Sequence, residues 1–131
     1  MVKILYVANP EEVEHFWEFS SSEGIPPGTH ITCTTCIEEA LKKMDSETRS
    51  GEKYNMMVLS EIGQDQSIRL TREGKRKGLN VVILDGNDPA MRKIGREAGA
   101  DRVFSRYSEQ QRLVDYIAGV ADRQDDSSQT D

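Results

Sequence analysis

Two cysteines separated by two residues, Cys33 and Cys36, form the first pattern that could do chemistry. In a redox-active pair of this spacing, both thiols belong at the start of a helix, where the helix dipole lowers the thiol pKa. Because Cys33 falls within a predicted strand, we expect two structural cysteines, with a redox role for Cys36 as the alternative. A zinc site would need two further ligands, and neither His15 nor His30 has a matching spacing.

A basic run with the sequence RLTREGKRKG begins at Arg69 and is the second candidate. Such a cluster can bind an acidic partner or nucleic acid. It contains no aromatic residue that would stack on bases, and the whole chain carries a formal charge of −6. The sequence therefore favours a solvated helix face, and it predicts neither nucleic acid nor an anionic membrane as the partner.

The elements that must position these residues are five short apolar runs that alternate with helical patterns. This alternation is typical of a parallel sheet that is covered by helices on both faces. The strands are predicted at residues 3–7, 29–34, 54–59, 80–84 and 102–104. The helices are predicted to begin at Asn9 and to cover residues 35–44, 64–77, 88–99 and 108–121, with a polar turn at 45–52. In the helix at 64–77, only Ile68 and Leu70 are apolar enough to anchor it.

The composition changes after Ala121, where the remaining residues, DRQDDSSQTD, offer nothing to bury. We therefore expect one domain at residues 1–121 and a disordered polar tail at 122–131. No apolar run reaches the length of about 18 residues that a membrane span needs. The first residues are too short for a signal-peptide core, and two cysteines suit a reducing compartment, so we expect a cytoplasmic protein.

Five phrases carry a family resemblance by their order and spacing: KILYVANPEE, EEALKKM, YNMMVLSE, NVVILDG and REAGADRVFSR. Over residues 2–121 the sequence resembles the receiver domains of two-component response regulators. The resemblance implies an α/β, flavodoxin-like (βα)5 three-layer sandwich. Its parallel sheet would have the strand order 2-1-3-4-5.

The resemblance also implies a phosphorylation site at the carboxyl ends of the strands. Receivers use an acidic pair to hold Mg²⁺, an Asp that accepts the phosphoryl group, a Thr or Ser, and a Lys. In that order, this sequence has other residues at those positions: Ala8, Asn9, Ser60, Asp85 and Arg106. The aromatic switch position falls on Val103. We therefore expect a pseudo-receiver with a degenerate phosphorylation site, no catalytic residue, no metal and no cofactor.

Asp85 and Arg106 would follow neighbouring strands in this sheet order. An arginine fork suits a carboxylate, so a standing ion pair between the two is one hypothesis. The other reading is a pair of solvated charges on adjacent loops, worth about 0–1 kcal/mol.

The function favoured by this pattern is phosphorylation-independent regulation through a protein partner, such as a signalling kinase, a regulator or an output protein. The resemblance implies that the fourth helix, fifth strand and fifth helix form the contact surface, which receivers also use as a homodimer interface. On this surface we expect Met91, Arg92, Val103, Tyr107, Arg112 and Tyr116.

Two other functions remain open. One is a small-molecule-binding or enzymatic flavodoxin-like domain, with a crevice at the strand ends lined by Asn9, Ser60, Glu61, Asp85 and Arg106. The other is a receiver with degraded chemistry that still takes a phosphoryl group at Ser60.

Overall fold

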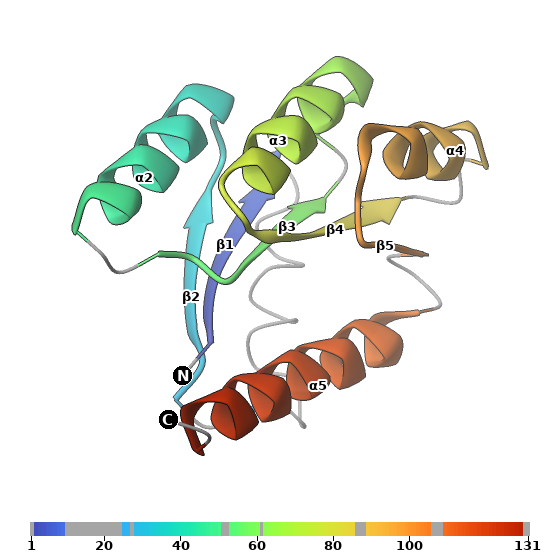
Figure 1. Ribbon diagram of the computed structural model, residues 1–131. Helices are drawn as coiled ribbons and strands as arrows, with labels where there is room; N and C mark the ends of the chain where they lie inside the picture. The colour runs from blue at the N-terminus through green and yellow to red at the C-terminus, as the bar shows by residue number, and fades with distance from the viewer. Residues whose placement is uncertain are drawn as a thin grey trace.

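The computed structural model describes residues 2–9, 25–26, 28–50, 53–60, 62–85, 89–105 and 109–129, without the side chains of 47–50 and 122–129. Its five strands are β1 (Lys3–Ala8), β2 (His30–Thr34), β3 (Met56–Ser60), β4 (Asn80–Asp85) and β5 (Arg102–Ser105). They form one parallel sheet in the order β2-β1-β3-β4-β5 (Figure 1). The predicted fold class and strand order are confirmed.

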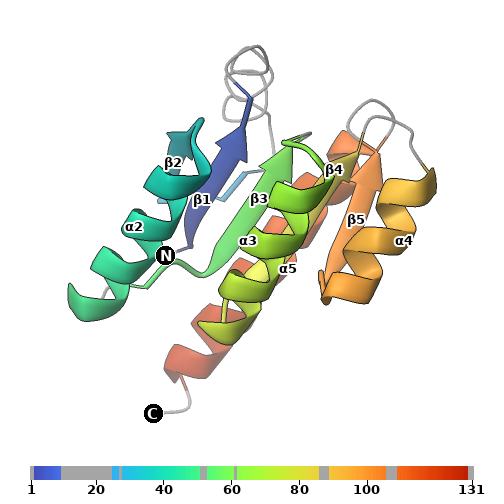
Figure 2. The same cartoon turned by 90° about the horizontal axis from the view of Figure 1, so that it is seen from above.

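The described helices cover both faces of this sheet. They are α2 (Ile37–Ser50), α3 (Gln64–Arg76), α4 (Pro89–Ala98) and α5 (Gln110–Gln129). Helices α2, α3 and α4 lie on one face, and α5 lies on the other (Figures 1 and 2). Helices α2, α3 and α4 each lead from one strand into the next parallel strand, and α5 follows β5, as the alternating sequence pattern requires.

The three central strands, β1, β3 and β4, are buried on both faces because they are apolar at successive positions. Adjacent side chains of a strand point to opposite faces. Thus Met56 packs in a cluster with Leu113 and Ile117 of α5, while Met57 packs in a second cluster with Leu70 of α3. The strand register is therefore fixed from both sides, and the carboxyl ends of the strands are held in place.

Helix α3 packs on the sheet through mostly small residues. Ser67, Leu70, Thr71 and Gly74 are buried, whereas Ile68, which the sequence predicted as an anchor, is only half-buried. A Cβ atom added at Gly74 would lie 2.8 Å from the Met57 Cε atom and 3.0 Å from a Val81 methyl group. The helix lies close to the sheet because this position has no side chain.

Two helices extend beyond their predicted ends. The predicted turn at 45–52 is wrong up to Ser50, where α2 ends, and α5 continues past Ala121 to Gln129, where the sequence predicted disorder. Neither extension contains glycine or proline, and each added residue gains a backbone hydrogen bond once a helix has formed. The helix predicted to begin at Asn9 lies largely outside the described residues. Of the helices in the described part of the chain, none is long and apolar enough to cross a membrane.

Candidate functional site

The residues of the degenerate site lie at one edge of the sheet, where the parallel strands end. Ala8 is the register partner of Ser60, and Asp85 is the partner of Ser105. All four residues are at most 2% exposed. Asn9, the next residue after Ala8, is exposed. The structure therefore brings together four of the five positions expected from the sequence, and Arg106 lies outside the described residues.

Ser60 takes the central place in this group, at the end of β3. Its side chain is fully buried, and its Oγ atom has no hydrogen-bond partner among the residues that the structure describes. A serine nucleophile needs a base or a metal ion to activate its hydroxyl group. Within the described residues no basic side chain contacts Oγ, so no general base activates this hydroxyl group there.

The donors at the strand ends do not suit a magnesium ion, which prefers carboxylate oxygens and waters. The two positions that would supply an acidic pair hold a methyl group and an amide, at Ala8 and Asn9. Among the residues that the structure describes, no group of three or more His, Cys, Asp or Glu side chains is arranged to hold a metal ion. Glu61 lies outside this described part.

A buried carboxylate at the end of β4 is bound by an arginine of α4. The Asp85 side chain is 0% exposed, and its Oδ2 atom accepts a hydrogen bond of 3.1 Å from Arg92 Nε. The same guanidinium group donates from Nη2 to Glu109 Oε1 at 2.6 Å. Arg92 thus joins the end of β4 to the residue that precedes α5.

Glu109 also joins β5 to α5. Its Oε1 atom accepts a hydrogen bond from the Ser105 backbone N–H at 2.9 Å, and its Oε2 atom accepts one from Arg112 Nη1 at 2.9 Å. The bond from the Ser105 backbone, followed by the bond from Arg92, lowers the pKa of the Glu109 carboxyl group below its ordinary value. The bond to Glu109 is also the main reason why the pKa of Arg92 is raised. We call Asp85, Arg92, Ser105 and Glu109 the α4–β5 network.

The sequence did not predict this network. It paired Asp85 with Arg106, which the described residues do not include, and it placed Arg92 on a contact surface. One signal was present: Arg92 lies in the first turn of α4, where the helix dipole disfavours a positive charge. A cation at that position indicates a nearby carboxylate. The role of Glu109 has no comparable signal, because it depends on how β5 and α5 meet.

The expected contact surface is only partly on the outside of the molecule. Val103 is wrong as a surface residue, because it is 8% exposed and points from β5 into the core beside Gly95 of α4. Met91 is half-buried against the same core cluster. Arg112 is exposed, and Tyr107 lies outside the described residues.

Tyr116 belongs to α5, and its half-buried side chain packs against the sheet. Its hydroxyl group donates a hydrogen bond to the Asn80 side chain, and its ring meets the Phe104 ring edge-on at 6.2 Å. The Arg102 guanidinium lies 5.3 Å from the centre of the Tyr116 ring. These contacts fix α5 against β4 and β5.

The two cysteines are both free, with Cys33 half-buried in β2 and Cys36 exposed before α2. Burial, together with the nearby Glu39, raises the pKa of the Cys33 thiol. Redox-active pairs of this spacing instead depend on a lowered thiol pKa. The geometry therefore gives Cys33 no activated thiolate, as the structural interpretation expects.

Solved structures with the same arrangement of strands and helices include several response regulator domains. A LuxR family DNA-binding response regulator from Silicibacter pomeroyi is 18% identical, with a TM-score of 0.68, over 92% of this chain and 91% of that one. A response regulator receiver domain protein from Clostridium thermocellum is 16% identical, with a TM-score of 0.67, over 95% and 98%.

A third similar structure, from Burkholderia pseudomallei, is described as pilus assembly-related. It is 12% identical, with a TM-score of 0.69, over 92% of this chain and 90% of that chain. No protein-family model and no curated protein matches the sequence. At these identities the similarity establishes a receiver-like fold.

Proposed function

We propose that this chain is a receiver-like regulatory domain that binds a protein partner and does not use phosphorylation as its input. The observation that carries the proposal is Ser60. A serine with a buried, unpartnered hydroxyl group stands at the strand end where a receiver would carry its acceptor carboxylate. The structures with the same fold include response regulators, which supports a signalling role.

The neighbouring strand ends give the same indication. A phosphoryl group would carry two negative charges into this edge of the sheet, and a divalent cation would be needed to balance them. Ala8 provides no ligand for such a cation, and Asp85 would repel the phosphoryl group. The cation nearest to Asp85 in the described residues is Arg92, which already binds two carboxylates.

The α4–β5 network would hold α4, β5 and the start of α5 in one conformation. In receivers this is the region of the contact surface. Charge-assisted hydrogen bonds join β4, α4, β5 and the start of α5 without any phosphoryl group. The partner would then recognise a surface that is already formed, and regulation would come from the availability of the partner or from another ligand. A homodimer through α4, β5 and α5 belongs to the same proposal.

Ser60 phosphorylation and a small-molecule site receive less support from the geometry. A donor would have to reach an Oγ atom that lies in a side chain with 0% exposure. Of the predicted lining residues that the structure describes, Asn9 is exposed, while Ser60 and Asp85 lie beneath the surface.

The test is to incubate the full chain with acetyl phosphate and Mg²⁺ and to measure its intact mass. We expect no mass increase equal to a phosphoryl group, because the residue at the acceptor position, Ser60, is fully buried. A Ser60→Asp variant, with its folding checked by circular dichroism, should also remain unmodified, since it still has no acidic pair for Mg²⁺. Stoichiometric phosphorylation of the wild-type chain would overturn the proposal.

A further inference from the structure

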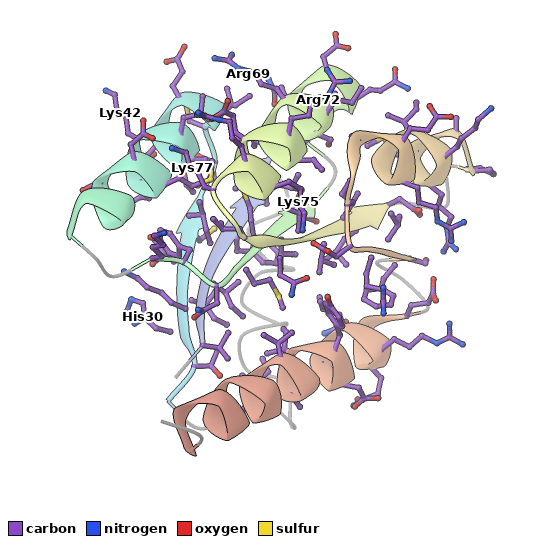
Figure 3. All side chains as sticks on the ribbon, viewed as in Figure 1. His30, Lys42, Arg69, Arg72, Lys75 and Lys77 are labelled. Atoms are coloured by element: carbon purple, nitrogen blue, oxygen red, sulfur yellow. The ribbon has the colours of Figure 1, made fainter. Side chains whose placement is uncertain are left out.

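The outer side of α3 carries a stripe of arginines. Arg69, Arg72 and Arg76 follow one another at helical spacings of three and four residues and are all exposed. The opposite side of the helix, with Leu70 and Gly74, packs on the sheet. Figure 3 shows Arg69 and Arg72 pointing away from the sheet, with Lys42 on the outer side of the neighbouring helix α2.

The two lysines near the end of α3, Lys75 and Lys77, form ion pairs with carboxylates of other elements. Lys75 binds both carboxylate oxygens of Asp101, at 3.0 and 2.9 Å, and Lys77 binds Asp45 of α2. These pairs tie the end of α3 to its neighbours on both sides. Arg76 pairs with Glu73 at 2.7 Å, within the same helix.

Three cations on this face are left without such a partner. Within the described part of the chain, no ion pair or side-chain hydrogen bond involves Lys42, Arg69 or Arg72. Asp65 is exposed in the first turn of α3, where the helix dipole favours an acid. The folded chain thus uses Lys75 and Lys77 internally and leaves the two arginines and Lys42 available to an external anion.

The positive charge is concentrated on this helix. Residues 64–77 contain five basic and two acidic side chains, whereas the rest of the chain contains 12 basic and 21 acidic ones. At physiological salt, charges are screened over about 8 Å, so an anion on α3 responds mainly to the local positive charge. This separation of charge allows an acidic chain to bind an acidic ligand.

The size of the stripe favours a peptide over a nucleic acid. From Arg69 to Arg76 the helix rises by only about 10 Å. Proteins that hold duplex DNA commonly contact about 6–10 phosphates, more than this face offers, and the rest of the acidic chain would repel a long polyanion. Each of the two guanidinium groups can donate a pair of hydrogen bonds to a carboxylate of a short acidic segment. Such a segment need not extend beyond the stripe.

We propose that Arg69 and Arg72 of α3, with Lys42 of α2, form a docking surface for an acidic segment of a partner protein. This surface is separate from the α4, β5 and α5 region that the family resemblance indicated. The inference rests on the proposed function, because it names the chemistry of the protein partner.

The test uses the full isotope-labelled chain and a short polyglutamate peptide, followed by NMR titration near neutral pH. We expect amide shifts centred on residues 69–72 of α3 and on Lys42. An Arg69→Gln/Arg72→Gln variant should bind the peptide about tenfold more weakly. A Lys93→Gln/Arg96→Gln variant is the matched control, since it removes the same charge from exposed positions of α4, and its affinity should change less than about twofold.

Three results would overturn this docking surface. They are equal weakening in the two variants, no binding of polyglutamate to the wild-type chain, and tighter binding of an oligothymidylate of equal charge. The melting temperatures of both variants are measured to exclude unfolding. Phosphoryl transfer to the chain would contradict the proposed function and leave this binding result unaffected, so the two ideas fail separately.

Discussion

At the residue scale, Ser60 and Arg92 set the character of the site. Ser60 places a buried hydroxyl group without a hydrogen-bond partner among the described residues at the end of β3. Arg92 bridges two carboxylates, that of Asp85 at the end of β4 and that of Glu109 just before α5. A buried polar group without a partner costs about 1–3 kcal/mol of folding free energy. The Ser60 hydroxyl group makes no hydrogen bond within the described residues that would offset this cost.

Replacing Ser60 by Ala should keep or raise the free energy of unfolding, by up to about 1 kcal/mol, because it removes a buried hydroxyl group that makes no hydrogen bond. Thr71→Val should behave in the same way, since the Thr71 Oγ1 atom is also buried and unpartnered. Urea denaturation of both variants measures this. A loss of more than about 1 kcal/mol in Ser60→Ala would mean that its hydroxyl group binds something in the folded protein.

The lowered pKa of Glu109 makes the α4–β5 network sensitive to acid. A carboxyl group with a lowered pKa in the folded state adds stability above its unfolded pKa, about 4.3, and this stability disappears as the pH falls through the folded value. We expect the free energy of unfolding of Glu109→Gln to be lower than that of the wild type at neutral pH. The difference between the two should shrink as the pH falls below the unfolded pKa of Glu109. Urea unfolding at a series of pH values measures the difference. A constant difference would contradict the charge-assisted role of Glu109.

At the scale of elements, the close approach of α3 to the sheet depends on Gly74. Alanine has a higher helix propensity, worth about 1 kcal/mol, but the new methyl group would meet Met57 and Val81 at 2.8 and 3.0 Å. We expect Gly74→Ala to lower the free energy of unfolding by about 1–3 kcal/mol, because overpacking outweighs the propensity gain.

Gly119→Ala in α5 is the matched control, because a Cβ atom there would meet nothing within 4 Å. It should raise the free energy of unfolding by about 0.5–1 kcal/mol through helix propensity alone. Thermal and urea unfolding compare the two variants. Equal effects would show that α3 can move away from β3 and β4 at little cost.

The elements were also the part of the structure that the sequence predicted best. Continuous apolar runs such as residues 80–84 require burial on both faces, so the strands followed from the pattern. The order of the strands came instead from the family resemblance. The packing face of α3 was harder to predict, because Ser67, Thr71 and Gly74 carry no apolar signal. The ion pair between Asp85 and Arg92 was missed for a related reason: Arg92 reaches Asp85 only after α4 has folded back over the sheet.

At the scale of the whole molecule, two charged regions lie in different parts of the fold. The network at the strand ends holds α4, β5 and α5 together, while unpaired cations lie on the outer side of α2 and α3 (Figures 1 and 3). Because the chain is acidic elsewhere, binding of an acidic segment to α3 should weaken as salt increases and screens the few local cations. Repeating the polyglutamate titration at increasing sodium chloride tests this, and salt-independent binding would point to apolar contacts instead.

The central claim is that the strand ends do not respond to a phosphoryl group. Amide NMR spectra of the full chain, recorded before and after addition of beryllofluoride and Mg²⁺, test it most directly, because beryllofluoride occupies the place of a phosphoryl group on a carboxylate. We predict that the amide signals of Ser60, Asp85 and Ser105 keep their positions. Saturable shifts of these signals that spread into α4 would contradict the account.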